Sequence, residues 1–250
     1  MSVRTIDRQA VRAWRPRSGN RLVAPDGSTL TLDHPTHGFD EPWFTESRVR
    51  LAGSPAASSV GVRAFETGPV GTVDGHVAVL LEGAYVAEYA GQGGTFLLAQ
   101  NADASTGLVA WQGQWHEVWC WVNIPGPTHT QMLHPLSGLN FTDTPAGLRV
   151  RPARTEEYQR ITALKHIPGV GLAKVSQTAA VASDLPSWSG HKVAVGEVWR
   201  QRVGADIPGN HPAAIVLAAP TTVITIDPRD GGDEDTALAF LSAMKSATWQ

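Results

Sequence analysis

Alternating apolar and polar positions dominate residues 21–150 and predict a series of short strands. Turns containing glycine or proline, such as Asp74-Gly75 and Pro125-Gly126-Pro127, separate the apolar runs. No long helical pattern lies between them, so the strands should pair in a largely antiparallel sheet. The expected strands are Thr29–Leu32, Arg48–Ala52, Val60–Phe65, His76–Leu81, Ala84–Ala90, Thr95–Gln100, Leu108–Trp111 and Glu117–Val122.

Beyond residue 150 the pattern mixes helices with strands. A helix is expected over Thr155–His166, where two acids stand in the first turn, and another begins at about Asp233 and closes the chain. Further strands are expected at Leu172–Gln177, Lys192–Arg202, Ala214–Ala218 and Thr222–Ile226. The predicted fold class is therefore α+β, a mostly antiparallel β-sheet with a few helices and a C-terminal helix.

The patterning divides the chain into a basic arm at 1–21, a strand-rich first half at 22–150 and an α+β second half at 151–250. Two short matches hint at an internal duplication of the two halves. Gly75–Val79 resembles Gly190–Val195 with one insertion, and Leu136–Leu139 parallels Leu241–Met244. The spacing of the two matches is similar enough for a duplicated unit with one altered loop.

The arm is the most unevenly charged segment of the chain. Six arginines and one aspartate give residues 1–21 a charge of +5, and the total of −3 leaves −8 for the remainder. Its apolar and basic residues fall on separate stripes of a helix, which could meet lipid, nucleic acid or an acidic protein surface. Docking on an acidic protein surface is preferred, through Arg4, Arg8, Arg12, Trp14 and Arg15.

Composition places the chain among globular proteins that lack disulfides. Hydrophobic residues make up 42% and charged residues only 17%, so much of the surface is uncharged or covered by a partner. Cys120 is the single cysteine, and the first residues lack the apolar run of a signal peptide. No continuous apolar run is long enough to span a bilayer as a helix. A cytoplasmic location, or incorporation into a particle, is expected.

Four tryptophans between Trp111 and Trp121 form the most unusual segment. If it runs as one strand, Trp111, Trp115, Trp119 and Trp121 share one face. Most of these rings should fill the core, because four exposed indoles would form a very large apolar patch. The alternatives are a sugar-stacking platform or a protein-binding surface, the latter centred on Trp115 and Trp119.

The densest polar cluster runs from Asp33 to Glu41. His34, His37 and Asp40 could supply nitrogen and oxygen ligands to a divalent metal, although their spacing matches no established pattern. The plainer interpretation is a surface turn in which Asp33 or His34 hydrogen-bonds nearby backbone.

Leu164–Gly171 resembles the hairpin of a helix-hairpin-helix DNA-binding motif, but a helix stop followed by a strand fits it better. No nucleophile elbow or nucleotide-binding loop is present, so no cofactor is expected, and nucleic acid is an improbable partner. An enzyme is disfavoured, although a site assembled from distant residues would escape detection.

These patterns favour a non-catalytic protein-interaction or structural component, or an accessory, of a larger assembly such as a phage tail, virion or secretion apparatus. The excess of arginine over lysine suggests a GC-rich bacterium or its phage as the source. The expected partner is a protein, which includes a second copy of this chain. The rivals are an enzyme or metal-dependent binder using Asp33–Glu41, and a carbohydrate-binding module using the Trp111–Trp121 strand.

Overall fold

The computed structural model describes residues 19–50, 62–152, 157–201, 213–228 and 232–250. Contacts divide the chain into two compact units. Among the described residues, the first unit holds 25–27 and 44–159, and the second holds 19–24, 28–43 and 160–250. Antiparallel sheet dominates both units, which confirms the predicted α+β class.

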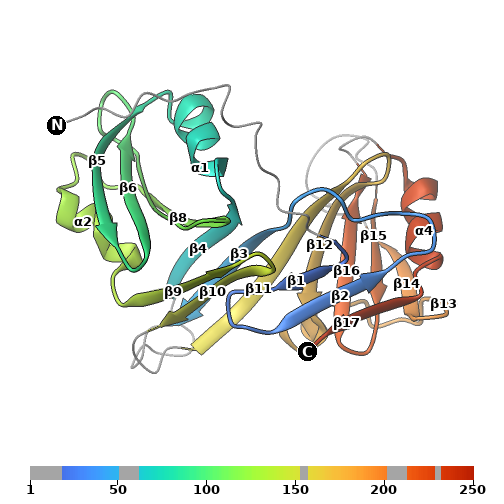
Figure 1. Cartoon of the computed structure of the whole chain (residues 1–250). Helices are drawn as coiled ribbons and strands as arrows, with labels where there is room; N and C mark the ends of the chain where they lie inside the picture. The colour runs from blue at the N-terminus through green and yellow to red at the C-terminus, as the bar shows by residue number, and fades with distance from the viewer. Residues whose placement is uncertain (1–18, 51–61, 153–156, 202–212, 229–231) are drawn as a thin grey trace. The chain divides into compact units, whose positions relative to one another are not determined.

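The first unit is built on six antiparallel strands in the order β3-β4-β8-β7-β6-β5. Helical segments α1 and η2 cover one face, and α2 and η3 cover the other (Figure 1). A separate hairpin, β9–β10, packs against the α2 side. The elements are β3 (Phe44–Arg50), β4 (Val62–Pro69), α1 (Thr72–Gly75), η2 (His76–Leu80), β5 (Ala84–Gly91), β6 (Gly94–Gln100), β7 (Gly107–Gln112), β8 (His116–Val122), α2 (His129–Leu133), η3 (His134–Leu136), β9 (Leu139–Thr144) and β10 (Gly147–Pro152).

The second unit has six antiparallel strands in the order β11-β12-β16-β15-β14-β13 and a second sheet in the order β1-β2-β17. Helix α4 packs against β15 and β14. The elements are β1 (Arg21–Val23), β2 (Thr29–Asp33), β11 (Glu157–Ile167), β12 (Gly171–Gln177), α3 (Thr178–Val181), η4 (Ala182–Asp184), β13 (His191–Val193), β14 (Gly196–Gln201), β15 (Ala214–Ala218), β16 (Thr222–Asp227), α4 (Glu234–Ser242) and β17 (Ser246–Trp249).

The two units repeat one chain order. In each, a hairpin is followed by a short helical segment, four strands in a meander, and a second helical segment, and the last strand of the meander pairs with the second strand of the hairpin. Leu136–Leu139 and Leu241–Met244 both fall where the second helical segment ends. Gly75–Val79 is helical whereas Gly190–Val195 contains β13, so this sequence match joins elements that are not equivalent.

The strand predicted at His76–Leu81 is wrong, because residues 72–80 are helical. Val73, Val77 and Leu81 are buried at intervals of four residues, while Val79 and Leu80 are exposed. Intervals of four place side chains on one face of a helix. The buried Glu117 also accepts hydrogen bonds from the backbone N–H groups of Gly71 and Val73, at 3.0 and 2.9 Å, and so stabilises the start of this helix.

The helix predicted at Thr155–His166 is also wrong. Residues Glu157–Ile167 form β11, which pairs with β12 through a tight turn at 168–170. Ile161, Ala163, Lys165 and Ile167 are all buried, which is the alternation of a strand. The segment that resembled a helix-hairpin-helix motif is therefore a β-hairpin.

The helices of the described residues are short. The longest, α4, has nine residues, and it confirms the expected helix near the C-terminus, with β17 following it. The Asp233 side chain accepts a hydrogen bond from the Thr236 N–H at 2.7 Å and caps α4, which buries Ala237, Phe240 and Leu241. None of the described helices has the length and apolar character to cross a membrane.

Candidate functional site

An open groove forms where the central strand β8 ends in the first unit. Along β8, Val118, Cys120 and Val122 point into one core, whereas Trp119 and Trp121 face the α1 side. After Val122 the chain leaves the sheet through a segment rich in proline and glycine, and this exposes 44% of Ile124. The strand end thus presents an indole and an aliphatic side chain close to the surface.

Helical segments α2 and η3 form the other side of the groove and are held firmly. Thr128 and Gln131 make reciprocal bonds at the start of α2: the Gln131 N–H donates to Thr128 Oγ1, and the Thr128 N–H donates to Gln131 Oε1. At the other end, Arg63 Nη1 donates to the carbonyl oxygens of Ser137 and Pro135, at 2.5 and 3.4 Å. This side of the groove is therefore fixed by hydrogen bonds at both ends.

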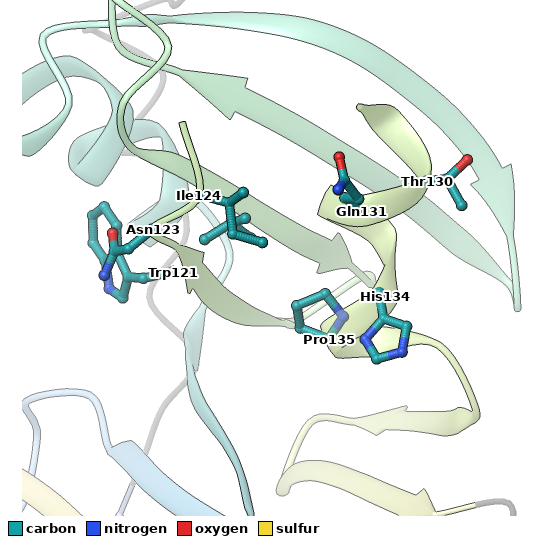
Figure 2. A pocket seen from close by; sticks show the side chains of 8 residues that line it. Trp121, Asn123, Ile124, Thr130, Gln131, His134 and Pro135 are labelled. Atoms are coloured by element: carbon teal, nitrogen blue, oxygen red, sulfur yellow. The ribbon is translucent and has the colours of Figure 1, made fainter. Parts of the chain in front are cut away.

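The groove has a volume of about 400 Å³ and contains no acidic side chain, lysine or arginine. Figure 2 shows Trp121 and Asn123 on one side, Gln131 and His134 on the other, and Ile124 between them. Its lining residues are Trp121, Val122, Asn123, Ile124, Thr130, Gln131, His134 and Pro135. Apolar side chains with a few amides and one imidazole are suited to binding an uncharged apolar group, with polar contacts at the rim.

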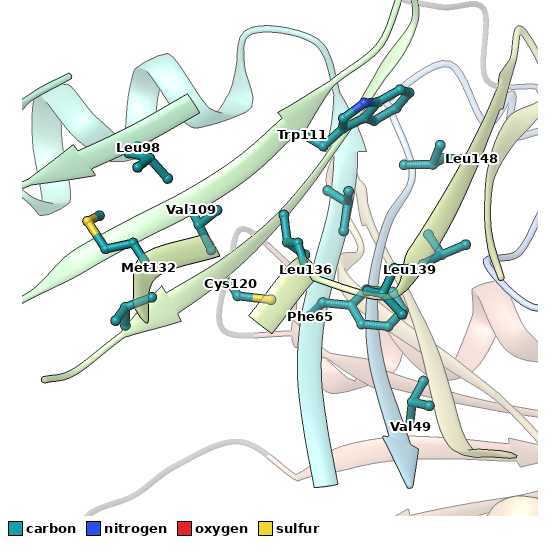
Figure 3. Packing of buried hydrophobic residues seen from close by; sticks show 13 residues of the cluster. Val49, Phe65, Leu98, Val109, Trp111, Cys120, Met132, Leu136, Leu139 and Leu148 are labelled. Carbon is teal, nitrogen blue, oxygen red and sulfur yellow. The ribbon is translucent and has the colours of Figure 1, made fainter. Parts of the chain in front are cut away.

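The groove lies over a well-packed core. Val122, Met132 and Leu136 belong to a buried cluster with Phe65, Val109 and others, each with 3% or less of its surface exposed (Figure 3). Such a core fixes the groove residues above it, because close-packed interiors do not deform readily.

Cys120 lies within this core and should not react in the folded protein. Only 3% of it is exposed, its thiol donates to the carbonyl oxygen of Ala64 at 3.3 Å, and burial raises its pKa to about 12. Because the thiolate is the reactive form, we expect no labelling by Ellman's reagent at pH 8 in the native state and one thiol per chain in guanidinium chloride. Rapid labelling of the native protein would contradict the described packing.

The four tryptophans do not share a face, so the geometry expected for a sugar-stacking strand is absent from this segment. A turn separates β7 from β8, and the register pairs Trp111 with Val118 and Ala110 with Trp119, which places Trp111 and Trp119 on opposite faces. Both are core residues, with 2% and 1% exposed, as expected for most of these rings. Of the two tryptophans predicted to bind a partner, only Trp115, in the turn, retains appreciable exposed surface.

His34 and His37 lie together, but both ring nitrogens of His34 are already hydrogen-bonded. His34 Nδ1 accepts from the backbone N–H groups of Thr36 and His37, at 3.3 and 3.2 Å, and Nε2 donates to the Phe240 carbonyl at 3.1 Å. This confirms the interpretation of a turn stabilised by a histidine. No group of three metal-ligating side chains forms within the described ranges, so Asp40 does not complete a metal site with the two histidines.

Asp40 and Glu41 instead lie close enough to the buried Lys165 to influence its charge. Lys165 on β11 has 1% of its surface exposed, and its Nζ donates to the carbonyl oxygen of Glu41. Nζ also lies 4.4 Å from the ring centroid of Trp43 and 5.9 Å from that of Phe39. Burial lowers the Lys165 pKa to about 7, and the two acids partly oppose that shift.

Sequence reasoning missed Ile124, Gln131 and His134 as groove residues. The turn at Pro125-Gly126-Pro127 was noted, but the short helix after it carries only one signal, the Thr128 and Gln131 pair that forms a capping box. The arm residues Arg4, Arg8, Arg12, Trp14 and Arg15 lie outside the described residues. Comparison with protein-family models, curated proteins and solved structures finds no match to this chain.

Proposed function

We propose that this chain is a non-catalytic interaction protein, a component or accessory of a larger assembly, and that it binds a protein partner through the groove at the end of β8. The supporting observation is the groove itself, whose lining offers Trp121, Ile124 and Pro135 with uncharged polar groups and no acid or base pair for catalysis. Tryptophan anchors with polar neighbours are typical of binding hot spots.

The partner that fits is a protein segment with an uncharged apolar anchor. A charged group entering the groove would lose hydration without finding an opposite charge among the lining residues. A protein segment is favoured over a small apolar molecule because the same unit exposes 70% of Val79 and 62% of Leu80 on η2, and His76 of η2 lies 5.8 Å from Trp121, ring centroid to ring centroid. Exposed apolar residues beyond the groove suit an extended contact.

Ile124→Asp tests the proposal. An aspartate at the centre of the contact should weaken partner binding by about 30-fold or more, which corresponds to about 2 kcal/mol for a hot-spot residue. Gln114→Asp adds the same charge at an exposed turn of the same unit, outside the groove, and should leave binding unchanged. Tagged chains purified from the native host, with co-purifying proteins quantified by mass spectrometry, provide the measurement.

Light scattering of the purified variants separates a foreign partner from a second copy. Loss of a dimer in Ile124→Asp alone would identify this chain as its own partner. Recovery of every co-purifying protein, and an unchanged molar mass, in both variants would reject the groove as the binding surface.

A further inference from the structure

The second unit contains a small pocket of mixed polar and apolar lining between α3–η4 and the strands beneath them. Its volume is about 170 Å³, below the roughly 300 Å³ at which pockets begin to hold drug-sized ligands, so a small molecule or a single functional group fits it. Its lining combines hydroxyl and basic side chains with apolar ones: Arg160, Thr162, Lys174, Ser176, Val181, Asp184, Leu185, Gln201, Val216, Val223 and Thr225.

Because the two units share one chain order, the first unit shows which side chains occupy the position equivalent to this pocket. In the first unit, the strand pairing aligns Glu66, Trp119, Ala110 and Leu97 across β4, β8, β7 and β6. The corresponding row of the second unit is Lys174, Thr225, Val216 and Trp199 across β12, β16, β15 and β14. The two rows correspond because Leu97 and Trp199 stand at the same distance from the turn that joins the first two strands of each meander. Both rows lie beneath the first helical segment of their unit.

The two rows differ most at their centre. Trp119 is 1% exposed and packs with Val73 and Val77 of the covering helix, whereas Thr225 stands at the equivalent position in the second unit. A threonine is far smaller than an indole, so space remains where the first unit has core. The basic Lys174 also replaces the acidic Glu66, which reverses the charge beside that space.

The pocket hydroxyls favour a ligand with acceptor oxygens. Thr162 and Ser176 are 9% and 5% exposed, and their hydroxyl oxygens lie 3.3 Å apart. One hydroxyl can donate to the other, so a pair of this kind keeps one O–H hydrogen for an incoming acceptor. A buried donor without an acceptor is unfavourable, and a ligand oxygen would supply the missing acceptor.

The charges of the pocket favour the same ligand class. No described residue forms an ion pair with Lys174, whereas Arg160 Nη1 lies 3.7 Å from Asp184 Oδ2 at the rim. Two cations against one carboxylate leave the lining with a net charge of +1. We propose that this pocket binds a small oxyanion, a phosphate or carboxylate group, through Lys174, Thr225 and the Thr162–Ser176 hydroxyl pair.

Titration with inorganic phosphate, followed by amide chemical shifts at constant pH and ionic strength, tests the proposal. Saturable shifts are expected at Thr162, Lys174, Ser176 and Thr225. Lys174→Met should weaken phosphate binding about tenfold or more, because it removes a charge-assisted bond. Lys192→Met removes an exposed lysine of the same unit that does not line the pocket, and should leave the affinity unchanged.

A second arm repeats the titration with acetate, since either anion class fits the hydroxyls. Binding of both anions identifies a general oxyanion site, and binding of one alone identifies the class. The double variant Thr162→Val/Ser176→Ala removes both hydroxyls together, so neither is left without its partner and the variant should fold normally. It should bind phosphate more weakly than the wild-type chain does. Shifts identical to those with sodium chloride, or an affinity unaltered by Lys174→Met and by the double variant, would overturn the proposal.

Discussion

The free energy of unfolding should rise by about 1.5 kcal/mol between pH 7 and pH 8.5, and Lys165→Met should abolish most of that rise. Lys165 is almost fully buried, and its pKa is lowered to about 7 from an unfolded value of 10.5. Between these values the unfolded chain binds a proton that the folded chain has released. Stability therefore increases with pH in this range, with a slope that approaches about 1.4 kcal/mol per pH unit.

Burial raises the pKa values of Glu66 and Glu117, so any titration of these carboxyls above pH 7 opposes the effect of Lys165. The difference in slope between wild type and Lys165→Met therefore isolates the lysine. Burial lowers the pKa values of His34 and His76, but their contribution to stability changes with pH only below their unfolded value of 6.5. Burial raises the pKa values of Cys120 and Tyr158, whose effects oppose that of Lys165 and begin near their unfolded values of 9.0 and 10.0. Urea denaturation at half-unit pH steps measures the slope directly.

Two variants test whether Lys165 causes the rise in stability with pH. Lys192→Met removes an exposed lysine of the same unit and should keep the wild-type slope. Lys165→Ala should lose the slope and also cost about 2–4 kcal/mol at pH 7, since it leaves a cavity beside Trp43 and Phe39. A slope that persists in Lys165→Met would show that another group titrates.

The sequence predicts most of the sheet because alternation is a local signal. Ala214–Ala218 and Thr222–Ile226 form β15 and β16 nearly as expected, since their apolar residues are continuous and a turn separates them. The helix at 72–80 escaped prediction because it is two turns long and its stabilising partner, Glu117, lies 44 residues beyond Val73. The acids at the start of β11 resemble the first turn of a helix, which is why the sequence predicts a helix over Thr155–His166 where the structure has a strand.

The candidate sites depend on contacts between distant segments, and no local pattern reveals those. Lys165 lies in an ordinary strand pattern, and its carbonyl acceptor Glu41 is 124 residues away. The Asp33–Glu41 cluster is conspicuous by its composition, yet Asp40 and Glu41 act on the charge of Lys165, and His34 stabilises a turn. The oxyanion pocket becomes visible only when Thr225 is compared with Trp119 through the strand pairing of the two units.

Glu117→Ala should lower the free energy of unfolding by about 3 kcal/mol. The carboxylate has no exposed surface and accepts bonds from the N–H groups of Gly71 and Val73, and from Gln112 Nε2 at 2.5 Å. Removing it leaves buried donors without an acceptor, which costs about 1–3 kcal/mol each. Urea denaturation gives the total loss, and hydrogen exchange should show faster opening at residues 71–77.

Glu117→Gln separates the hydrogen bonds from the charge. Burial raises the Glu117 pKa above its unfolded value of 4.5, so the contribution of this carboxyl to stability is greatest below that pH and falls as pH rises through the folded pKa. The glutamine keeps one acceptor oxygen and cannot ionise. Glu117→Gln should therefore lower the free energy of unfolding by less than Glu117→Ala does. The difference in stability between wild type and Glu117→Gln should also shrink as pH rises above 4.5. Glu88→Ala, at an exposed position on β5, should change stability by less than about 0.5 kcal/mol. Equal losses in the Glu88 and Glu117 alanine variants would mean that the α1 start does not depend on this carboxylate.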